Sequence, residues 1–205
     1  MSGTTIETGK GGKMKRRALV RELLRDRGSL LVIGGLGAPA WDITAAGDVP
    51  ENLPLWGGMG AAAMMGLGLA LAQPSRPVAV ITGDGEMLMG IGSLATIGVQ
   101  RPRNLAIIVL DNEHYGETGM QETATRHGVD LAAMARGAGI GDCRLVRTAG
   151  EVTALREAMH AGAGPLFATV KIDEAPVPLV LPPREASILQ ARMREAILGQ
   201  AAHLQ

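Results

Sequence analysis

Short apolar runs alternate with longer amphipathic or small-residue segments along the chain. The apolar runs predict buried strands over residues 29–34, 77–82, 104–110, 144–147 and 165–172. The segments around them predict helices over residues 13–27, 58–72, 86–99, 130–137, 151–161 and 184–204. Strands that alternate with helices are typical of a parallel sheet covered on both faces. The pattern therefore predicts an α/β fold with a doubly wound parallel sheet.

The remaining segments are predicted to be irregular. Residues 1–13 are polar and are expected to form a disordered leader, so that a single domain with a C-terminal helix spans 14–205. The proline-interrupted segment 41–56 and the polar segment 112–127 are predicted loops. Residues 173–183 are a proline-rich connection to the last helix.

Composition narrows the classes of function. A chain of 205 residues, 46% of them hydrophobic, can bury a full core in one domain. Zero formal net charge and 2% aromatic residues argue against a nucleic-acid partner. The apolar segment 59–72 is too short and glycine-rich to span a membrane, and the leader lacks the apolar core of a secretory signal. With Cys143 as the single cysteine, these features predict a cytoplasmic protein.

Two polar segments each follow a predicted buried strand. Gly83-Asp84-Gly85 comes after the strand over 77–82, and Asp111-Asn112 comes after the strand over 104–110. The carboxyl ends of parallel strands are where open α/β sheets bind ligands. Asp84 and Asn112 offer hard oxygen ligands, and the glycines let the backbone approach a polyanion. This set predicts a magnesium ion that neutralises a diphosphate.

These segments resemble the signature of thiamine diphosphate enzymes, which is Gly-Asp-Gly and, about two dozen residues later, Asn-Asn or a variant. Asp111 stands where the first asparagine is usual. The resemblance extends upstream to Gly57-Gly58-Met59-Gly60 and downstream through Asn112-Glu113-His114-Tyr115-Gly116, and covers roughly residues 15–175. It implies the domain that binds the diphosphate end of the cofactor, here called the PP-type domain.

The resemblance also implies roles for individual residues. Magnesium would be bound by the side chains of Asp84 and Asn112 and by the backbone carbonyl of His114, with diphosphate oxygens and a water completing the octahedron. Met59 would support the bent cofactor, and the carbonyl of Gly57 would accept from its amino group. The predicted cofactor-binding residues are Gly35, Gly37, Gly57, Gly58, Met59, Gly83, Asp84, Gly85, Glu86, Asn112, His114, Tyr115, Gly116 and Glu117.

Several of these residues also have a simpler interpretation. Glu86 is expected to be a first-turn glutamate favoured by the helix dipole, turned away from the phosphates. The side chain of His114 is expected to orient or pack, and Met59 could fill the core. The segment 35–40 imitates a dinucleotide-binding fingerprint. Because no convincing helix follows Pro39, a loop that lends backbone to the cofactor site is the favoured interpretation.

Two further groups of polar residues are open to more than one interpretation. The basic residues of the first predicted helix are expected to form a solvated face, with a phosphate site as the alternative; they are Lys15, Arg16, Arg17, Arg21 and Arg25. A second group lies in the loop 112–127 and would either meet a substrate anion or be solvated; its members are Thr118, Gln121, Thr123, Thr125 and Arg126.

Residues 83–97 and 115–121 look most like sulfopyruvate decarboxylase β subunits and the matching part of phosphonopyruvate decarboxylase. These enzymes remove carbon dioxide from a 2-oxo acid that bears a second anion. In the family, the catalytic glutamate sits on a separate pyrimidine-binding domain, and 205 residues leave room for one sheet only. No catalytic residue is therefore predicted in this chain. An α-type partner is expected to supply the glutamate, in a hetero-oligomer that also self-associates. The alternatives are a subunit of another thiamine-dependent carboligase or oxidoreductase, and a non-catalytic binding protein.

Overall fold

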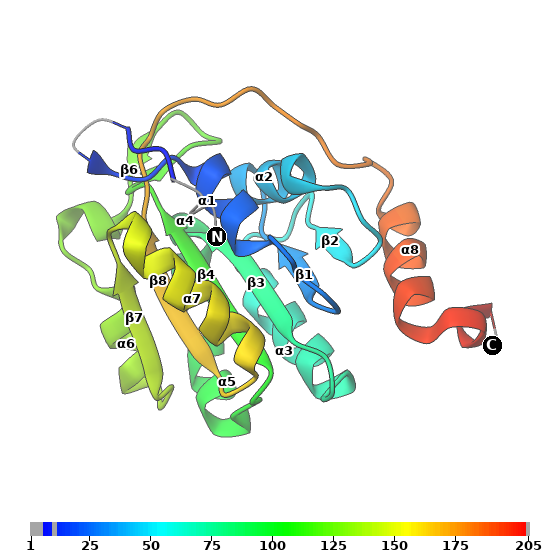
Figure 1. Cartoon of the computed structure of the whole chain (residues 1–205). Helices are drawn as coiled ribbons and strands as arrows, with labels where there is room; N and C mark the ends of the chain where they lie inside the picture. Colours follow the sequence, from blue (N-terminus) through cyan, green and yellow to red (C-terminus); the bar gives the residue numbers. More distant parts are fainter. Residues whose placement is uncertain (1–5, 10–11, 204–205) are drawn as a thin grey trace.

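A six-stranded parallel sheet forms the centre of the molecule. The computed structural model describes residues 6–9 and 12–203. The strand order is β2-β1-β3-β4-β8-β7, and every pair is parallel (Figure 1). The strands are β1 (Leu31–Gly34), β2 (Asn52–Pro54), β3 (Val78–Gly83), β4 (Leu105–Asp111), β7 (Asp142–Val146) and β8 (Leu166–Lys171). The predicted doubly wound α/β sheet is confirmed.

Helices cover both faces of this sheet. One layer contains α1 (Arg16–Leu23), α2 (Ala38–Ala46) and α7 (Ala149–Ala161); the other contains α3 (Ala62–Ala72), α5 (Ser93–Gln100) and α6 (Leu131–Gly137). Alternate residues of the central strands enter the two cores. Ile81 and Ile108 face the α1 and α7 side, while Val80 and Ile107 face the α3 and α5 side. Burial on both faces explains why these strands are continuous apolar runs in the sequence.

The segment 41–56 is not a loop, so this prediction was wrong. It contributes most of α2 and the whole of β2, an edge strand that pairs with β1. Pro39 lies in the first turn of α2, where a backbone N–H has no helical partner to lose. The expectation that no helix follows Pro39 therefore fails. Pro54 at the end of an edge strand is equally compatible with the sheet.

Two other predicted segments are subdivided. The helix expected over 86–99 is two helices, α4 (Asp84–Met89) and α5, separated at residues 90–92. The loop 112–127 contains a small hairpin of β5 (His114–Tyr115) and β6 (Gln121–Glu122), followed by a 3-10 helix over Ala124–His127. The hairpin places the residues after β4 along the carboxyl edge of the sheet.

Part of the predicted disordered leader packs onto the domain. Ile6 is buried, and the Gly9 N–H donates to the Lys13 carbonyl at 2.7 Å. Thr8 forms an antiparallel bridge with Met14, which is fully buried and also bridges Ile172. Within the described residues 6–9 and 12–13 the prediction of disorder is therefore wrong. Residues 1–5 and 10–11 lie outside the described part of the chain.

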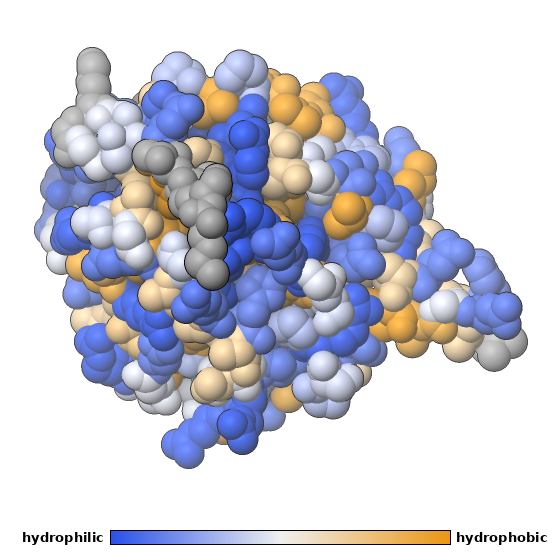
Figure 2. All heavy atoms as spheres, viewed as in Figure 1, coloured by the Kyte–Doolittle hydropathy of each residue, from blue (hydrophilic) through white to orange (hydrophobic). Residues whose placement is uncertain are grey.

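The C-terminal segment crosses the carboxyl edge of the sheet. After β8, residues 173–185 run over this edge to α8 (Ala186–Leu198), which packs beside β2 (Figure 1). Leu189 and Met193 are its buried residues, and Trp56 Nε1 donates to the Pro183 carbonyl at 2.7 Å. Figure 2 shows hydrophilic side chains spread over the face that α1 and α7 form. Within the described residues, no helix combines the length and the apolar character that crossing a membrane requires.

Candidate functional site

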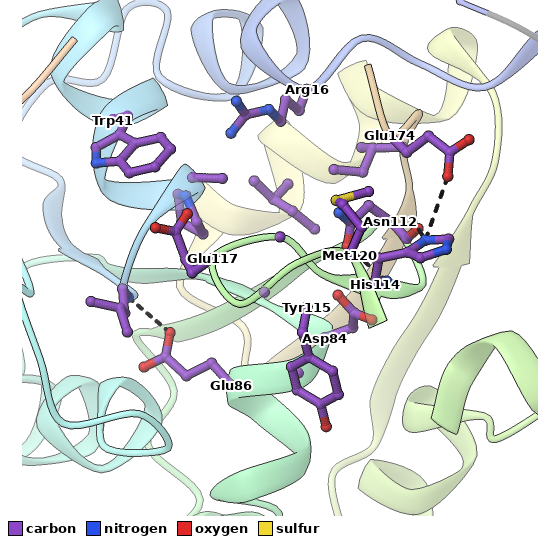
Figure 3. A pocket seen from close by; sticks show the side chains of 18 of the residues that line it. Arg16, Trp41, Asp84, Glu86, Asn112, His114, Tyr115, Glu117, Met120 and Glu174 are labelled. Carbon is purple, nitrogen blue, oxygen red and sulfur yellow. Dashed lines mark hydrogen bonds and ion pairs between the residues drawn. The ribbon is translucent and has the colours of Figure 1, made fainter. Parts of the chain in front are cut away.

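A cavity of about 620 Å³ lies at the carboxyl ends of the central strands (Figure 3). This is the edge at which open α/β sheets bind ligands. Ten of the predicted site residues line it: Met59, Gly83, Asp84, Gly85, Glu86, Asn112, His114, Tyr115, Gly116 and Glu117. The remaining four do not contribute to the lining: Gly35, Gly37, Gly57 and Gly58. The structure therefore brings most of the predicted set to one place.

Asp84 is a buried carboxylate at the start of α4. The residue is 1% exposed. Its Oδ2 accepts a hydrogen bond from Thr123 Oγ1 at 2.5 Å and lies 3.2 Å from Thr125 Oγ1, whose single proton is shared with the closer Asp111. Burial raises the pKa of Asp84 to about 6; nearby Asp111 adds to the shift, while the Thr123 hydrogen bond opposes it. Among the described residues, no cationic side chain forms an ion pair with it. A buried carboxylate without a counter-charge at a cavity wall is a natural position for a bound cation.

Asp111, the departure from the usual asparagine, is neutralised within the protein. The sheet register places it opposite Lys171, whose Nζ lies 2.6 Å from Asp111 Oδ2. Thr125 Oγ1 donates to the other carboxylate oxygen at 2.8 Å. Burial alone would lower the pKa of Lys171. The hydrogen bonds to Asp111 and Glu113 outweigh this effect and raise the pKa above its ordinary value. Asp111 is therefore a structural ion-pair partner, and Asp84 is the carboxylate left for a ligand.

The loop from Asn112 to His114 is held in a fixed conformation. Glu113 has a left-handed backbone with φ of 69° and pairs with Lys13 at 3.0 Å and Lys171 at 2.9 Å. Burial would raise the pKa of Glu113, but the hydrogen bonds from these lysines lower it to about 2. Asn112 Oδ1 accepts from the His114 N–H at 3.2 Å, and His114 Nδ1 lies 2.9 Å from the Asn112 carbonyl. The His114 ring thus orients this loop.

Glu86 turns away from Asp84, toward the loop after β1 (Figure 3). Its Oε2 accepts from the Leu36 N–H at 3.0 Å and from Thr82 Oγ1 at 2.7 Å. A Cβ on Gly35 would lie 2.0 Å from this oxygen, so only glycine leaves room for the contact. Gly37 has φ of 76°, and a Cβ there would lie 2.7 Å from Glu117 Oε1. These glycines accommodate two glutamates, which explains the false resemblance to a dinucleotide-binding loop.

Met59 and Tyr115 have different environments. Met59 is 36% exposed and lines the cavity, so the alternative that it fills the core is not supported. The Tyr115 ring packs against α4: a Cβ on Gly85 would lie 2.4 Å from Tyr115 Cε1. Gly85 therefore allows the ring and the start of α4 to approach closely.

The sequence interpretation misplaced several polar residues. Thr123 and Thr125 are buried hydrogen-bond donors to the aspartates, and so are neither solvated nor in contact with a substrate anion. For Thr118, Gln121 and Arg126 both alternatives stay open. Thr118 and Gln121 are exposed and bond each other, Thr118 also lines the cavity, and the half-exposed Arg126 pairs with Glu113 at 3.2 Å. Arg16, expected on a solvated face, is 8% exposed and lines the cavity. Trp41 and the segment 172–177 also line it and had no sequence signal, because their approach depends on the folded chain.

Comparison with known proteins gives consistent matches. Residues 43–170 match the family described as thiamine pyrophosphate enzyme, C-terminal TPP binding domain. The chain is 40% identical over 152 residues to sulfopyruvate decarboxylase subunit beta of Methanothermobacter thermautotrophicus, covering 73% of this chain and 78% of that one. It is 42% identical over 121 residues to phosphonopyruvate decarboxylase of Streptomyces viridochromogenes, covering 59% of this chain and 29% of that protein.

A solved structure supports the same fold. Benzoylformate decarboxylase from Polynucleobacter necessarius superposes with a TM-score of 0.68 at 20% identity, over 87% of this chain and 36% of that one. At this identity the likeness concerns the fold alone. The chain thus spans most of the sulfopyruvate decarboxylase subunit, and about a third of the phosphonopyruvate and benzoylformate decarboxylases.

Proposed function

The chain belongs to the thiamine pyrophosphate enzymes, through their C-terminal TPP-binding domain, and from this premise we propose that it is the diphosphate-binding subunit of a two-chain 2-oxo acid decarboxylase. The observation that carries the proposal is Asp84, a buried carboxylate that faces a cavity at the strand ends and lacks a cationic partner among the described residues. We propose that the enzyme acts on 2-oxo acids with a second anionic group, because the relatives are named sulfopyruvate decarboxylase and phosphonopyruvate decarboxylase.

The donor set fits magnesium and a diphosphate. We assign the Asp84 carboxylate, the Asn112 amide oxygen and the His114 carbonyl as ligands, because magnesium prefers hard oxygen donors. No group of three or more His, Cys, Asp or Glu side chains that could hold a metal occurs among the described residues. In the proposal, diphosphate oxygens and a water would complete the coordination of the ion. The amides proposed to meet the phosphates are those of Gly85, Glu86, Gly116 and Glu117.

The remaining residues position the cofactor. When bound, thiamine diphosphate supplies the electron sink for the carbanion that carbon dioxide leaves behind. The exposed Met59 side chain is assigned to the bent centre of the cofactor, and the Gly57 carbonyl to its amino group. Apolar residues of the cavity, such as Leu36, Ile172 and Val177, exclude water from the reacting region.

The rest of the catalytic machinery is assigned to a partner. The chain is similar over most of its length to a protein named as subunit beta. We assign the pyrimidine-binding surface and the catalytic glutamate to an α-type subunit, in a hetero-oligomer that also self-associates. The proposal includes a cytoplasmic location, consistent with Cys143, which forms no disulfide.

Calorimetry of the complex of this chain with its partner tests the metal assignment. Asp84→Ala is expected to lower the affinity for magnesium and thiamine diphosphate at least about tenfold. Mutation of residues that only hydrogen-bond to a metal ligand already lowers metal affinity by about this factor. Asp48→Ala, which removes a carboxylate paired with Arg192 outside the cavity, is the matched control and should bind as the wild type does. Equal affinity in Asp84→Ala and wild type would exclude Asp84 as a ligand.

A further inference from the structure

The cavity contains one strongly basic side chain. Arg16, the first residue of α1, lies beside Trp41 and Glu117 at the cavity wall (Figure 3). No other lysine or arginine occurs among the described residues that line the cavity. The acidic residues of the lining are Asp84, Glu86, Glu117, Asp173 and Glu174. An anionic group that enters this cavity therefore has a single guanidinium of this chain to pair with.

The hydrogen-bonding capacity of the Arg16 guanidinium is only partly used. Two arginines share the fully buried Asp42: Arg17 Nε donates to Oδ1 at 2.9 Å, and Arg16 Nη1 lies 3.2 Å from Oδ2. The second contact is an ion pair without hydrogen-bond geometry, since both Arg16 Nη1 and Asp42 Oδ2 lack a hydrogen-bond partner among the described residues. Arg16 Nη1 therefore remains a buried donor that Asp42 does not satisfy. A buried donor without an acceptor favours the binding of an anion.

The surroundings keep this guanidinium available. Burial lowers the pKa of Arg16, while Asp42, Glu117 and Asp173 counter the shift and Arg17 adds to it. The group remains a cation, because arginine does not lose its proton in proteins. Glu117 lies against Gly37 and makes no ion pair with Arg16. The guanidinium can therefore turn from Asp42 toward a ligand without giving up another carboxylate.

The position of Arg16 separates it from the proposed metal site. In Figure 3 it lies on the opposite side of the cavity from Asp84, with the Asn112–Glu117 loop between them. Arg16 and Asp84 therefore occupy different parts of the cavity wall, and a ligand of Arg16 need not be the phosphate group assigned to the metal at Asp84.

We propose that Arg16 binds the second anionic group of the substrate, a sulfonate or a phosphonate, and thereby makes the site prefer such 2-oxo acids to pyruvate. The proposal rests on the proposed decarboxylase function. The planar guanidinium can donate two parallel hydrogen bonds to a tetrahedral oxyanion, and a lysine could offer only a point charge. Pyruvate has no group to place there and so gains nothing from Arg16.

Steady-state kinetics of the reconstituted complex provide the first test. Arg16→Gln is expected to lower kcat/KM for sulfopyruvate about tenfold or more, mainly through KM, while kcat/KM for pyruvate stays constant. Arg17→Gln is the matched control, because it disturbs the same Asp42 from outside the cavity lining. The same measurement with phosphonopyruvate distinguishes a sulfonate from a phosphonate. The substrate whose kcat/KM falls more in Arg16→Gln carries the group that Arg16 binds. An equal loss for all three substrates would overturn the proposal.

Binding of an unreactive probe separates this proposal from the decarboxylase function. Sulfoacetate is titrated into the cofactor-loaded complex, and Arg16→Gln is expected to weaken its binding at least about tenfold. Should the wild-type complex turn over none of the acids, the decarboxylase proposal fails, but a sulfoacetate site that depends on Arg16 still stands. Equal sulfoacetate binding in the two proteins, or a loss of thiamine diphosphate affinity alone, would overturn the role of Arg16. If Arg16→Gln does not fold, Arg16→Lys keeps a cation beside Asp42 and carries the same test, because a lysine lacks the planar pair of donors that is proposed to hold the oxyanion.

Discussion

Two buried aspartates at neighbouring strand ends differ in function because their partners differ. Asp111 forms an ion pair with the Lys171 ammonium at 2.6 Å. Among the described residues, the side-chain partners of Asp84 are threonine hydroxyls and include no cation. The ammonium neutralises one carboxylate and leaves the other for a cation. The register of β4 and β8 places Lys171 opposite Asp111, which explains how an aspartate can stand where the family usually has an asparagine.

Met59 offers a residue-scale prediction. Met59→Ala is expected to lower turnover of the reconstituted complex by on the order of a hundredfold, because a displacement of about 1 Å in the reacting groups has this effect. Affinity for magnesium and thiamine diphosphate should fall much less, since other contacts anchor the phosphates. Stability should change by only about 0.5 kcal/mol, because the side chain is 36% exposed. Turnover, calorimetry and thermal melting are measured on the same preparations.

The control for Met59 is Met134→Ala. Met134 is 42% exposed on α6 and lies outside the cavity lining, so its truncation should leave turnover unchanged. A large drop in melting temperature of Met59→Ala, with normal turnover per folded molecule, would contradict the assignment of Met59 to the cofactor.

At the scale of elements, the break between α4 and α5 positions the loop that carries Met59. Gly90 lies where α4 ends, and a Cβ on it would come 2.1 Å from the Gly60 carbonyl oxygen. The loop of residues 57–60 therefore rests on the end of α4, whose first residue is Asp84. The short helix α4 thus connects Asp84, the proposed magnesium ligand, at its start to the contact with the Met59 loop at its end.

Gly90→Ala is expected to displace this loop. The added methyl meets backbone atoms that cannot rotate away, so stability should fall by about 1–3 kcal/mol and turnover should fall with it. Gly92→Ala is the matched control: its φ is −61° and a Cβ there would meet no atom within 4 Å among the described residues, so it should be neutral or stabilising by about 0.4–1 kcal/mol. Urea unfolding and turnover of both variants check the prediction. Indistinguishable variants would mean that the contact of Gly60 with Gly90 does not set the loop.

At the scale of the whole molecule, the cavity is built from distant parts of the chain. Arg16 and Trp41 come from the α1 and α2 layer, and Asp84 from the end of β3. Residues 172–177 come from the segment after β8 that crosses the carboxyl edge. The lining is therefore complete only when α1 and the segment after β8 are both folded onto the sheet.

The purified chain alone is expected to show no decarboxylase activity. The reason is chemical: the glutamate assigned to the pyrimidine ring belongs to the α-type partner, so the cofactor would bind through its diphosphate without being activated. An assay of the single chain with magnesium, thiamine diphosphate and sulfopyruvate checks this, with the reconstituted complex as the positive control. Turnover by the chain in the demonstrated absence of a partner would contradict the division of the active site between two subunits.

Five of the six strands of the main sheet, and the edge that carries the site, are predictable from the amino-acid sequence, whereas the edge strand β2 is not. Continuous apolar runs such as Val78–Ile81 encode buried parallel strands, because both faces of each strand are covered. Asp84 and Asn112 follow two such runs directly, so their positions at the carboxyl edge follow from local sequence alone. The orientation of Glu86 was also predictable, since a carboxylate beside a diphosphate must turn away.

The side chains that surround these residues come from distant parts of the chain and could not be predicted from local sequence. Nothing near Arg16 in the sequence indicates that α1 points it into the cavity, and nothing near Thr123 indicates its bond to Asp84. The helix after Pro39 was missed because its stability comes from packing against the sheet, with no strong local pattern. Local patterns specify strands and turns, because these depend on neighbouring residues. Burial, ion pairing and cavity lining depend on contacts between residues far apart in the chain, which exist only after folding.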